Sequence, residues 1–284
     1  MYVEAIVRMA LAEDIGNGDI TTQLTIPEEA PLEDEFTAEI IARQEGIVAG
    51  MDFADIVFGA SLFEPAGDDS ETCMLPKIGD GCSVEPGDCI AVVEGHPRTI
   101  LTGERVALNF LQHMSGIATL TNRYAELVSH TKAKIIDTRK TTPGLRRLEK
   151  YAVTVGGGHN HRFNLSDGIL IKDNHIAAAG GVTAAVTAAK KHAPHTLKIE
   201  CEVTNLDELN EAIAAGADSV LLDNMPIDML KQAVEFVAGR VITEASGGVN
   251  ESNVAAIAET GVDLISVGAL THSAPALDIS LEFK

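Results

Sequence analysis

Cationic side chains gather in one segment of this chain, residues 137–175, which reads DTRKTTPGLRRLEKYAVTVGGGHNHRFNLSDGILIKDNH. The whole chain of 284 residues carries a formal net charge of -21, so this local excess is unusual for it. Arginine presents a planar fork that matches two oxygens of a carboxylate or a phosphate. The rest of the chain repels an anion, so the segment predicts a local pocket for a small polyanion. The cations are Arg139, Lys140, Arg146, Arg147, Lys150, Arg162 and Lys172.

The composition excludes several classes of protein. The acidic balance argues against binding to nucleic acid, which needs a basic face, and against docking on anionic lipid. The apolar content of 45% is enough for a sizeable core. No apolar run reaches transmembrane length and the start lacks the pattern of a signal peptide, so we expect a cytoplasmic location. The four cysteines include no CxxC pair, and we expect them to be buried or half-buried residues without a disulfide or zinc.

From about residue 134 onward, short β-rich runs alternate with alanine-rich helical runs. This alternation predicts parallel strands joined by right-handed crossovers. The strands are apolar throughout, as expected when both faces of a sheet are buried. The predicted strands are residues 134–139, 168–173, 197–203, 219–224, 241–246 and 264–269.

The first ~110 residues lack this rhythm and predict a separate α/β unit. We expect a helix over 2–12, a strand pair over 36–49 turned at Glu45-Gly46, and a hairpin over 78–94 turned at Pro86-Gly87. A long helix over 102–129, broken near Ser115-Gly116, would bridge the two halves. The acidic stretches 27–35 and 65–71 read as surface loops.

Polar or glycine residues follow each of the six predicted strands. Parallel strands point their carboxyl ends to one rim of an α/β barrel, and the loops there build the active site. We therefore expect a functional rim, in which glycines after the last two strands let backbone N–H groups approach a phosphate beside a helix start near Asn250. The rim residues are Thr138, Arg139, Lys140, Lys172, Glu200, Glu202, Asp223, Asn224, Glu244, Ser246, Gly247, Gly248, Gly268 and Ala269.

Two carboxylates of this rim, Glu202 and Asp223, need a reason to face a polyanion. They could hold sugar hydroxyls, bind a Mg²⁺ that screens phosphate, or stabilise an oxocarbenium-like centre. His161 could hydrogen-bond the anion or orient a neighbour. The sequence has no HExxH, Walker, GxGxxG or GxSxG motif.

Several motifs in this order resemble the quinolinate phosphoribosyltransferases, the carboxylating nicotinate-nucleotide pyrophosphorylases. They include DTRKTTPGLRRLEKYAV, GGGHNHRFNLSDGILIKDNH, IECEV, LLDN and EASGGV, and the likeness covers nearly the full chain. The resemblance implies an N-terminal α/β sandwich domain, here residues 1–112 with the tail 272–284 packed back on it. It also implies an incomplete, about six-stranded TIM-like barrel, here 113–271. It further implies a homodimer in which the site is shared between subunits, and Mg²⁺ bound with phosphoribosyl pyrophosphate.

The resemblance also implies roles for individual residues. Arg105 would reach the partner's substrate, although its pattern alone reads as an ordinary helical arginine. Glu202 and Asp223 would lie on the ribose or metal side, either as direct ligands or through the substrate. The expected catalytic residues are Lys140, Lys172, Glu202 and Asp223. The expected substrate-binding residues are Arg105, Thr138, Arg139, Lys140, His161, Arg162, Lys172, Glu202, Asp223, Ser246, Gly247, Gly248, Val267, Gly268 and Ala269.

The implied activity is phosphoribosyl transfer to quinolinate with decarboxylation, giving nicotinate mononucleotide, pyrophosphate and CO₂ in NAD biosynthesis. The residues alone leave three alternative functions open. One is a phosphoribosyltransferase of the same fold acting on nicotinate or another carboxylated heterocycle. Another is a lyase or aldolase with Lys140 or Lys172 as a Schiff base. A third is a non-catalytic protein that binds an anionic metabolite.

Overall fold

The structure is a computed structural model that describes residues 2–26, 36–59 and 72–284. The acidic stretches 27–35 and 65–71 lie outside the described residues. The chain divides into two compact units, residues 1–120 with 274–284, and residues 121–273. Each unit has its own sheet, antiparallel in the first and parallel in the second.

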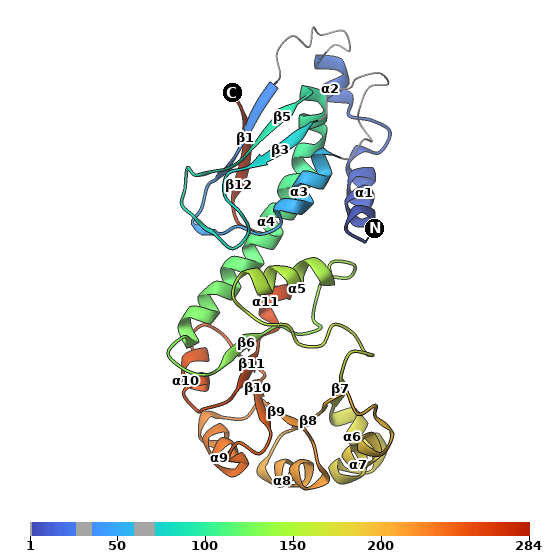
Figure 1. The fold of residues 1–284 in the computed structure, drawn as a ribbon, viewed down its shortest axis with the longest axis vertical. Coiled ribbons are helices and arrows are strands. Elements are labelled where there is room, and N and C mark those ends of the chain that lie inside the picture. The colour runs from blue at the N-terminus through green and yellow to red at the C-terminus, as the bar shows by residue number, and fades with distance from the viewer. Residues whose placement is uncertain (1, 27–35, 60–71) are drawn as a thin grey trace. The chain divides into compact units, whose positions relative to one another are not determined.

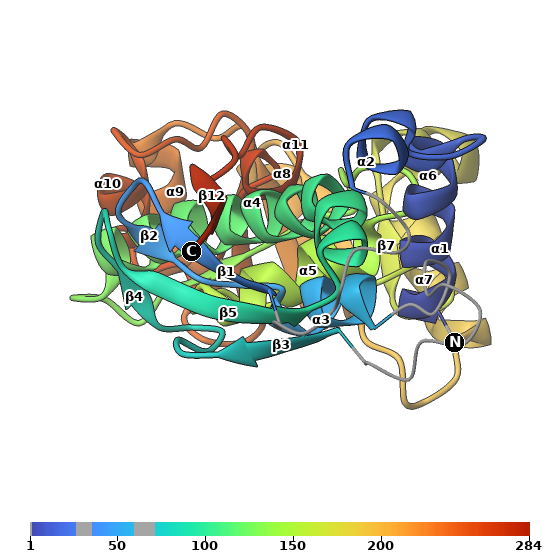
Figure 2. The same ribbon diagram turned by 90° about the horizontal axis from the view of Figure 1, so that it is seen from above.

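The sheet of the first unit has the strand order β12-β1-β5-β3. Its strands are β1 (Phe36–Ala42), β3 (Cys73–Pro76), β5 (Cys89–Gly95) and β12 (Ile279–Phe283). The last strand of the chain therefore pairs with the first one, which keeps the C-terminal segment in this unit. Helix α3 (Met51–Phe58) packs beside β3 (Figure 1 and Figure 2). The two N-terminal helices are α1 (Tyr2–Ile15) and α2 (Ile20–Thr25).

Two predicted hairpins of this unit are wrong in their pairing. The segment 36–49 does contain two strands, but β1 pairs with β12 and β5, while β2 (Gly46–Ile47) pairs with β4 (Ser83–Val84). The segment 78–94 turns at Pro86-Gly87 as predicted, with φ +99° at Gly87, yet β4 and β5 belong to different sheets. The turn residues act locally, whereas the partner of each strand is set by distant segments.

The predicted break in the long helix is also wrong. Helix α4 runs without interruption over Pro97–Val128. Ser115 uses its hydroxyl to accept from the N–H of Ala49 at 3.0 Å. A Cβ at Gly116 would lie 2.1 Å from the carbonyl oxygen of Pro275. The Ser-Gly pair therefore permits close approach of two backbone segments rather than ending the helix.

The second unit contains the six predicted parallel strands, and their number and type are confirmed. The sheet order is β6-β11-β10-β9-β8-β7, so β6 and β7 form its two edges and the barrel is incomplete. Figure 1 shows the strands in an arc with α8, α9 and α10 along its outer side. The strands are β6 (Lys134–Ile136), β7 (Ile169–Ile171), β8 (Ile199–Val203), β9 (Ser219–Asp223), β10 (Ile242–Ser246) and β11 (Leu264–Ser266). The helices are α5 (Arg146–Val155), α6 (Asp173–Ala179), α7 (Val182–His192), α8 (Leu206–Ala215), α9 (Ile227–Val237), α10 (Val254–Ala258) and α11 (Ala269–His272).

Residues after α5 line the open edge of this sheet beside β6. His159 forms a parallel bridge with Ile136, its N–H donates to Ile135, and its C=O accepts from the N–H of Asp137. The stretch that begins at His159 therefore extends the pairing of β6 beyond the strand itself. This local pairing brings the second half of the cationic segment to the carboxyl end of the sheet.

Two further expectations need correction. The helix after Ser246-Gly247-Gly248 begins at Val254 and not near Asn250, because residues 251–253 form a turn. Cys73 and Cys82 are exposed rather than buried, while Cys89 is half-buried and Cys201 is buried, and none of these four described cysteines is in a disulfide. Across the part of the chain that the structure describes, none of the helices combines the length and apolar character needed to span a membrane.

Candidate active site

The alternation of side chains along β8 places two carboxylates on one face of the sheet. Ile199, Cys201 and Val203 are buried and share one face, while Glu200 and Glu202 share the other. Helices α7 and α8 pack against β8 and cover one of its faces. Within a mostly apolar strand, this alternation presents acidic groups from a rigid element.

A buried ion pair holds the backbone of the site. Asp137, just after β6, pairs with Lys150 of α5, and neither side chain is exposed to solvent. Burial raises the pKa of Asp137 and lowers the pKa of Lys150, and their mutual attraction opposes both shifts. Asp137 also accepts from the N–H of His161 at 2.8 Å, and Lys150 donates to the carbonyl of His161 at 3.0 Å. The pair therefore fixes the place of His161 in the loop before β7.

Two arginines of the site lie close enough for their charges to interact. Burial lowers the pKa of Arg162, and the charge of Arg139 lowers it further. Arg162 donates to the carbonyl of Gly168 at 2.8 Å, which fixes its guanidinium beside β7. The Nε atoms of both arginines are buried and have no hydrogen-bond partner among the described residues. Two adjacent guanidinium groups form a suitable site for an anion with several oxygens.

Lys172 and Glu202 meet from two neighbouring strand ends. Lys172 follows β7 and its Nζ lies 3.4 Å from Oε2 of Glu202 on β8. The lysine side chain is half exposed, whereas that of Glu202 is 12% exposed. The structure therefore brings together these two predicted catalytic residues as a half-exposed cation beside a largely buried carboxylate.

The ends of β9 and β10 are locked to each other. The N–H of Asn224 donates to the carbonyl of Ser246 at 2.9 Å, and its amide donates to Asp223 at 2.8 Å. Asn224 itself adopts a left-handed conformation with φ 52°. Gly247 has φ +93°, and a Cβ there would lie 2.2 Å from Oδ1 of Asn224. Gly248, with φ +61°, has no atom within 4 Å of such a Cβ, so its face is open.

The ends of β6 and β11 meet in a similar way. A Cβ at Gly268 would lie 3.1 Å from Cδ of Lys140. The hydroxyl of Thr271 donates to the carbonyl of Lys140 at 2.7 Å. The backbone N–H of Lys140 donates to the hydroxyl of Thr138 at 3.0 Å. These contacts place the exposed ammonium group of Lys140 next to the glycine-bearing end of β11. Val267 is buried there, and Ala269 opens the short helix α11.

Some cationic and imidazole side chains of the segment have structural roles. The guanidinium of Arg146 donates to the hydroxyl of Thr141 and to the carbonyl of Phe163, at 2.9 and 3.0 Å. His175 accepts from the N–H of Lys172 at 3.0 Å and so caps the start of α6. His159 contributes its backbone to the sheet edge. These contacts explain three residues whose roles the sequence leaves open.

Arg105 belongs to the first unit, on α4, with an exposed side chain 3.9 Å from Glu104. All the other predicted site residues belong to the second unit. The expected reach of Arg105 into a partner's site therefore stays a prediction.

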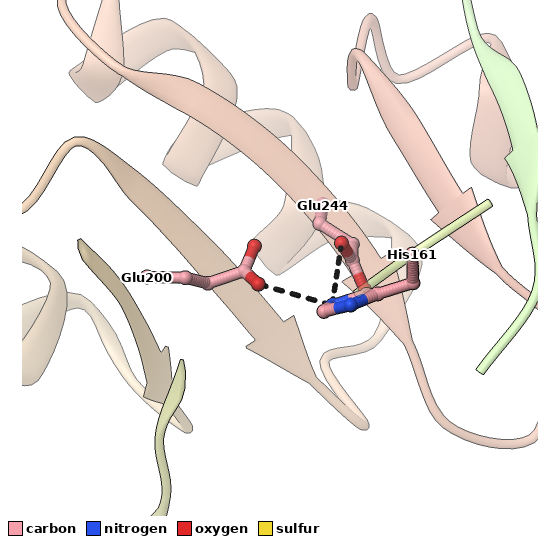
Figure 3. A group of neighbouring side chains, drawn as sticks. All are labelled: His161, Glu200 and Glu244. Carbon is pink, nitrogen blue, oxygen red and sulfur yellow. Dashed lines mark hydrogen bonds and ion pairs between the residues drawn. The ribbon is translucent and has the colours of Figure 1, made fainter. Parts of the chain in front are cut away.

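A cluster that the sequence does not predict lies within the sheet rather than at the strand ends, since Glu200 is the second residue of β8 and Glu244 is the third residue of β10. Nε2 of His161 is 3.1 Å from Glu200 and 3.8 Å from Glu244 of β10 (Figure 3). Burial raises the pKa of Glu244 to about 8, and the charge of Glu200 raises it as well. The sequence signal was present, because Glu244 is a charged residue in the middle of a short buried strand. Its partners come from a loop and from β8, which is not hydrogen-bonded to β10.

Comparison with known proteins agrees with this architecture. A family model described as the C-terminal domain of quinolinate phosphoribosyl transferase matches residues 117–282, and one for the N-terminal domain matches 19–115. A probable nicotinate-nucleotide pyrophosphorylase [carboxylating] of Bacillus subtilis is 46% identical, over 95% of this chain and 89% of its own length. The Mycobacterium leprae nicotinate-nucleotide pyrophosphorylase [carboxylating] is 45% identical, over 97% and 95%. The solved structure of the nicotinate-nucleotide pyrophosphorylase from Francisella tularensis superimposes with a TM-score of 0.90 at 44% identity, over 100% of this chain and 96% of that one.

Proposed function

We propose that this chain, which belongs to the quinolinate phosphoribosyltransferase family, transfers phosphoribose from phosphoribosyl pyrophosphate to quinolinate. Decarboxylation then gives nicotinate mononucleotide, with pyrophosphate and CO₂ as the other products. This reaction belongs to NAD biosynthesis.

One observation carries the proposal for the acceptor substrate. Arg139 and Arg162 lie close enough for their charges to interact, and each guanidinium can present paired N–H donors to a carboxylate. Quinolinate has two adjacent carboxylates and offers four oxygens to such donors. A monocarboxylate would leave part of this donor set unsatisfied, which costs binding free energy. The arginine pair therefore favours a dicarboxylated ring over nicotinate.

The donor substrate fits the other side of the rim. The exposed backbone at Gly248 and the ammonium of Lys140 beside Gly268 offer an N–H-rich, cationic surface for phosphate oxygens. The short α10 starts six residues after Gly248, so backbone and Lys140, rather than a helix start, supply the attraction.

In this reading, the chain orients the reactants and stabilises charge. The ring nitrogen of quinolinate attacks the anomeric carbon as the bond to pyrophosphate breaks. Positive charge then develops on the sugar, and the carboxylates of Glu202 and Asp223 favour it. The ring nitrogen becomes cationic and withdraws electrons, so the neighbouring carboxylate leaves as CO₂ and a proton takes its place. Arg139 and Arg162 hold the ring during both steps. The ion pair with Glu202 keeps the ammonium group of Lys172 close to the reactants.

Mg²⁺ is compatible with the residues at the donor side. Mg²⁺ is usually bound by one or two carboxylates together with substrate phosphates. Glu202 and Asp223, from adjacent strands, supply oxygen donors of this type. When bound with phosphoribosyl pyrophosphate, the ion would neutralise charge on the leaving pyrophosphate. Contact through the substrate alone is equally compatible with the two carboxylates.

The acceptor is tested by following both products with two substrates. With phosphoribosyl pyrophosphate and Mg²⁺, quinolinate should yield pyrophosphate and CO₂ in equal amounts. Nicotinate in place of quinolinate should yield little pyrophosphate and no CO₂. Equal turnover of nicotinate would instead favour a related phosphoribosyltransferase. Borohydride trapping of a carbonyl substrate on Lys140 or Lys172 would favour the lyase reading.

A homodimer with a shared site is part of the proposal, and Arg105 provides its test. Arg105→Ala and Lys172→Ala should each be inactive. If each site combines Arg105 of one subunit with Lys172 of the other, mixed dimers of the two variants contain one intact site. Random reassortment should then restore about a quarter of the wild-type activity. No recovery in verified mixed dimers would mean that both residues serve one subunit's site.

A further inference from the structure

The cluster of His161, Glu200 and Glu244 has no role in the function proposed above. Glu244 is 1% exposed and Glu200 is 9% exposed, so the carboxyl of Glu244 is removed from water and that of Glu200 is largely shielded from it. One atom from each of the three side chains lies within 4.8 Å of the others, a spacing that a metal ion could bridge. Figure 3 shows both glutamates directed at the same imidazole nitrogen, Nε2. Two explanations compete, namely a divalent metal site and a shared proton.

The other nitrogen of the ring decides between them. Nδ1 of His161 accepts a hydrogen bond from the N–H of Arg162 at 2.7 Å, so Nδ1 carries no proton. A neutral imidazole in this orientation carries its proton on Nε2 and donates it to Glu200 at 3.1 Å. A histidine that binds a metal does the reverse, because its free ring nitrogen donates to an acceptor. The hydrogen bonding therefore opposes a metal at Nε2.

The charges of the cluster then need one more proton. Burial penalises two adjacent carboxylates, and the pKa of Glu244 is raised accordingly, with the charge of Glu200 adding to the effect of burial. Burial opposes a charged His161, although the hydrogen bond with Glu200 and the charge of Glu244 raise its pKa overall. A proton on Nδ1 would face the N–H of Arg162, so the observed contact favours the neutral ring.

Among the described residues, no lysine or arginine is paired with Glu244 to replace this proton. Its neighbours with polar groups are Glu200 from β8, His161 from the loop before β7, and the hydroxyl of Ser266 from β11. On the far side of His161, Lys150 is already paired with the buried Asp137. One oxygen of Glu244, Oε1, has no hydrogen-bond partner among the described residues.

The cluster adjoins the anion site. Burial and the charge of Arg139 lower the pKa of Arg162, and the charge of Glu200 partly offsets this, so Glu200 and Arg162 lie within electrostatic reach of each other. A second negative charge at Glu244 would therefore act against a dianion bound at Arg139 and Arg162. It would also compete for the single proton on Nε2.

We propose that Glu244 is a positioning residue that stays protonated in the active enzyme, so that His161 keeps its Nε2–H tautomer and the arginine site accepts a dicarboxylate. This inference rests on quinolinate as the ligand of that site. It predicts an alkaline limit to activity that is set by Glu244 rather than by a residue that touches substrate.

Glutamine is the matched probe, because it resembles the neutral acid and cannot ionise. In the wild type, kcat/KM for quinolinate should fall about tenfold per pH unit above the pKa of Glu244. Glu244→Ala should lower kcat/KM at every pH, since it leaves a cavity beside His161. Glu244→Gln should recover most of that loss and should lack the alkaline fall. An unchanged alkaline limb in Glu244→Gln, or a variant as impaired as Glu244→Ala, would overturn the proposal.

A spectroscopic readout separates this inference from the substrate assignment. Infrared difference spectra of the protein without substrates should show the carbonyl band of a neutral carboxyl that disappears on raising the pH and is missing in Glu244→Gln. If that band is found but quinolinate is not turned over, the proposed reaction fails and the proton assignment stands. If turnover is normal and no band is found, the proton assignment fails. Stoichiometric binding of Mn²⁺ or Zn²⁺ that Glu244→Gln abolishes would support the metal explanation instead.

Discussion

Lys150 and Asp137 form an ion pair with no solvent exposure, and this pair holds both backbone polar groups of His161. The lysine belongs to α5 and the aspartate follows β6, so the contact joins a helix to a sheet edge. It also explains why part of the cationic segment is not directed at a ligand. A buried ion pair of this kind positions the backbone around it. The free-energy cost of removing its charges from water is offset only while both partners are present.

Lys150→Met should therefore destabilise the protein strongly, because it leaves Asp137 buried without its partner. We expect a loss of about 3–5 kcal/mol in the free energy of unfolding of the second unit. Urea unfolding followed by circular dichroism measures this. The matched control is Lys132→Met, because Lys132 forms an exposed pair with Asp263 at 2.7 Å. That variant should lose less than about 1 kcal/mol. Equal effects of the two substitutions would contradict the role given to burial.

Arg162→Ala should impair the binding of quinolinate and leave the fold intact. Removing a charged partner from a dicarboxylate costs about 2–5 kcal/mol, which should appear mainly as a higher KM for quinolinate. Steady-state kinetics at saturating phosphoribosyl pyrophosphate measure this. Arg123→Ala is the control, since its exposed guanidinium lies 3.7 Å from Glu251 in a surface pair. Near-normal kinetics for Arg162→Ala would refute the assignment of this arginine.

Gly247→Ala should disturb the donor side of the rim more than Gly248→Ala does. Both glycines have positive φ, so alanine costs roughly 1–2 kcal/mol in backbone strain at either position. Only at Gly247 would the methyl group meet Asn224, at 2.2 Å from Oδ1. Gly247→Ala should therefore show the larger rise in KM for phosphoribosyl pyrophosphate and the lower melting temperature. A larger effect at Gly248 would indicate that the exposed backbone there, and not the contact between the ends of β9 and β10, determines the binding of phosphoribosyl pyrophosphate.

Glu244→Gln should change how stability depends on pH. Glu244 has a pKa near 4.5 when unfolded and about 8 when folded, so the folded state holds the extra proton between these values. Its contribution is fully present below pH 4.5 and is lost as pH rises through about 8. Glutamine has no such loss, so the melting temperature of the variant relative to the wild type should rise from pH 5 to pH 8.5.

A change of roughly 2–4 °C for each kcal/mol is expected in a unit of this size, and calorimetry at the two pH values measures it. Titrating groups that do not interact with Glu244 are common to both proteins and cancel in the difference, whereas His161 and Glu200 interact with it and contribute to the difference. A difference that falls with pH would mean that Glu244 is ionised in the folded protein.

The sequence predicted the second unit better than the first, because local residue patterns are enough to identify the strands and helices of the second unit. Alternating apolar runs and alanine-rich helices identified all six parallel strands, and parallel topology then placed their polar ends at one edge. In the first unit, the turn at Pro86-Gly87 was found, but β1 pairs with β12 from the other end of the chain. No local pattern specifies such a partner. The break predicted at Gly116 is wrong for the same reason, since the role of this glycine depends on the distant Pro275.

The site shows the same division between local and distant information. Residue types identified the cations and the carboxylates at strand ends, because the charge of a side chain follows directly from its residue type. The cluster around His161 could not be derived, because Glu200 and Glu244 lie on strands that are not hydrogen-bonded to each other and their distance depends on sheet curvature. The direction of the Arg162 N–H, which fixes the tautomer of His161, is likewise set only by the folded loop.

The adjacent arginines are proposed to bind a doubly carboxylated ring beside an activated sugar, and the assigned reaction requires this contact. Its most direct test is the rate of pyrophosphate release with phosphoribosyl pyrophosphate and Mg²⁺, compared between quinolinate and nicotinate. We expect release that depends on quinolinate, with a kcat/KM at least about 100-fold above that for nicotinate, since one lost carboxylate contact costs about 3 kcal/mol. Release that is equal for the two acids, or that needs neither of them, would contradict it.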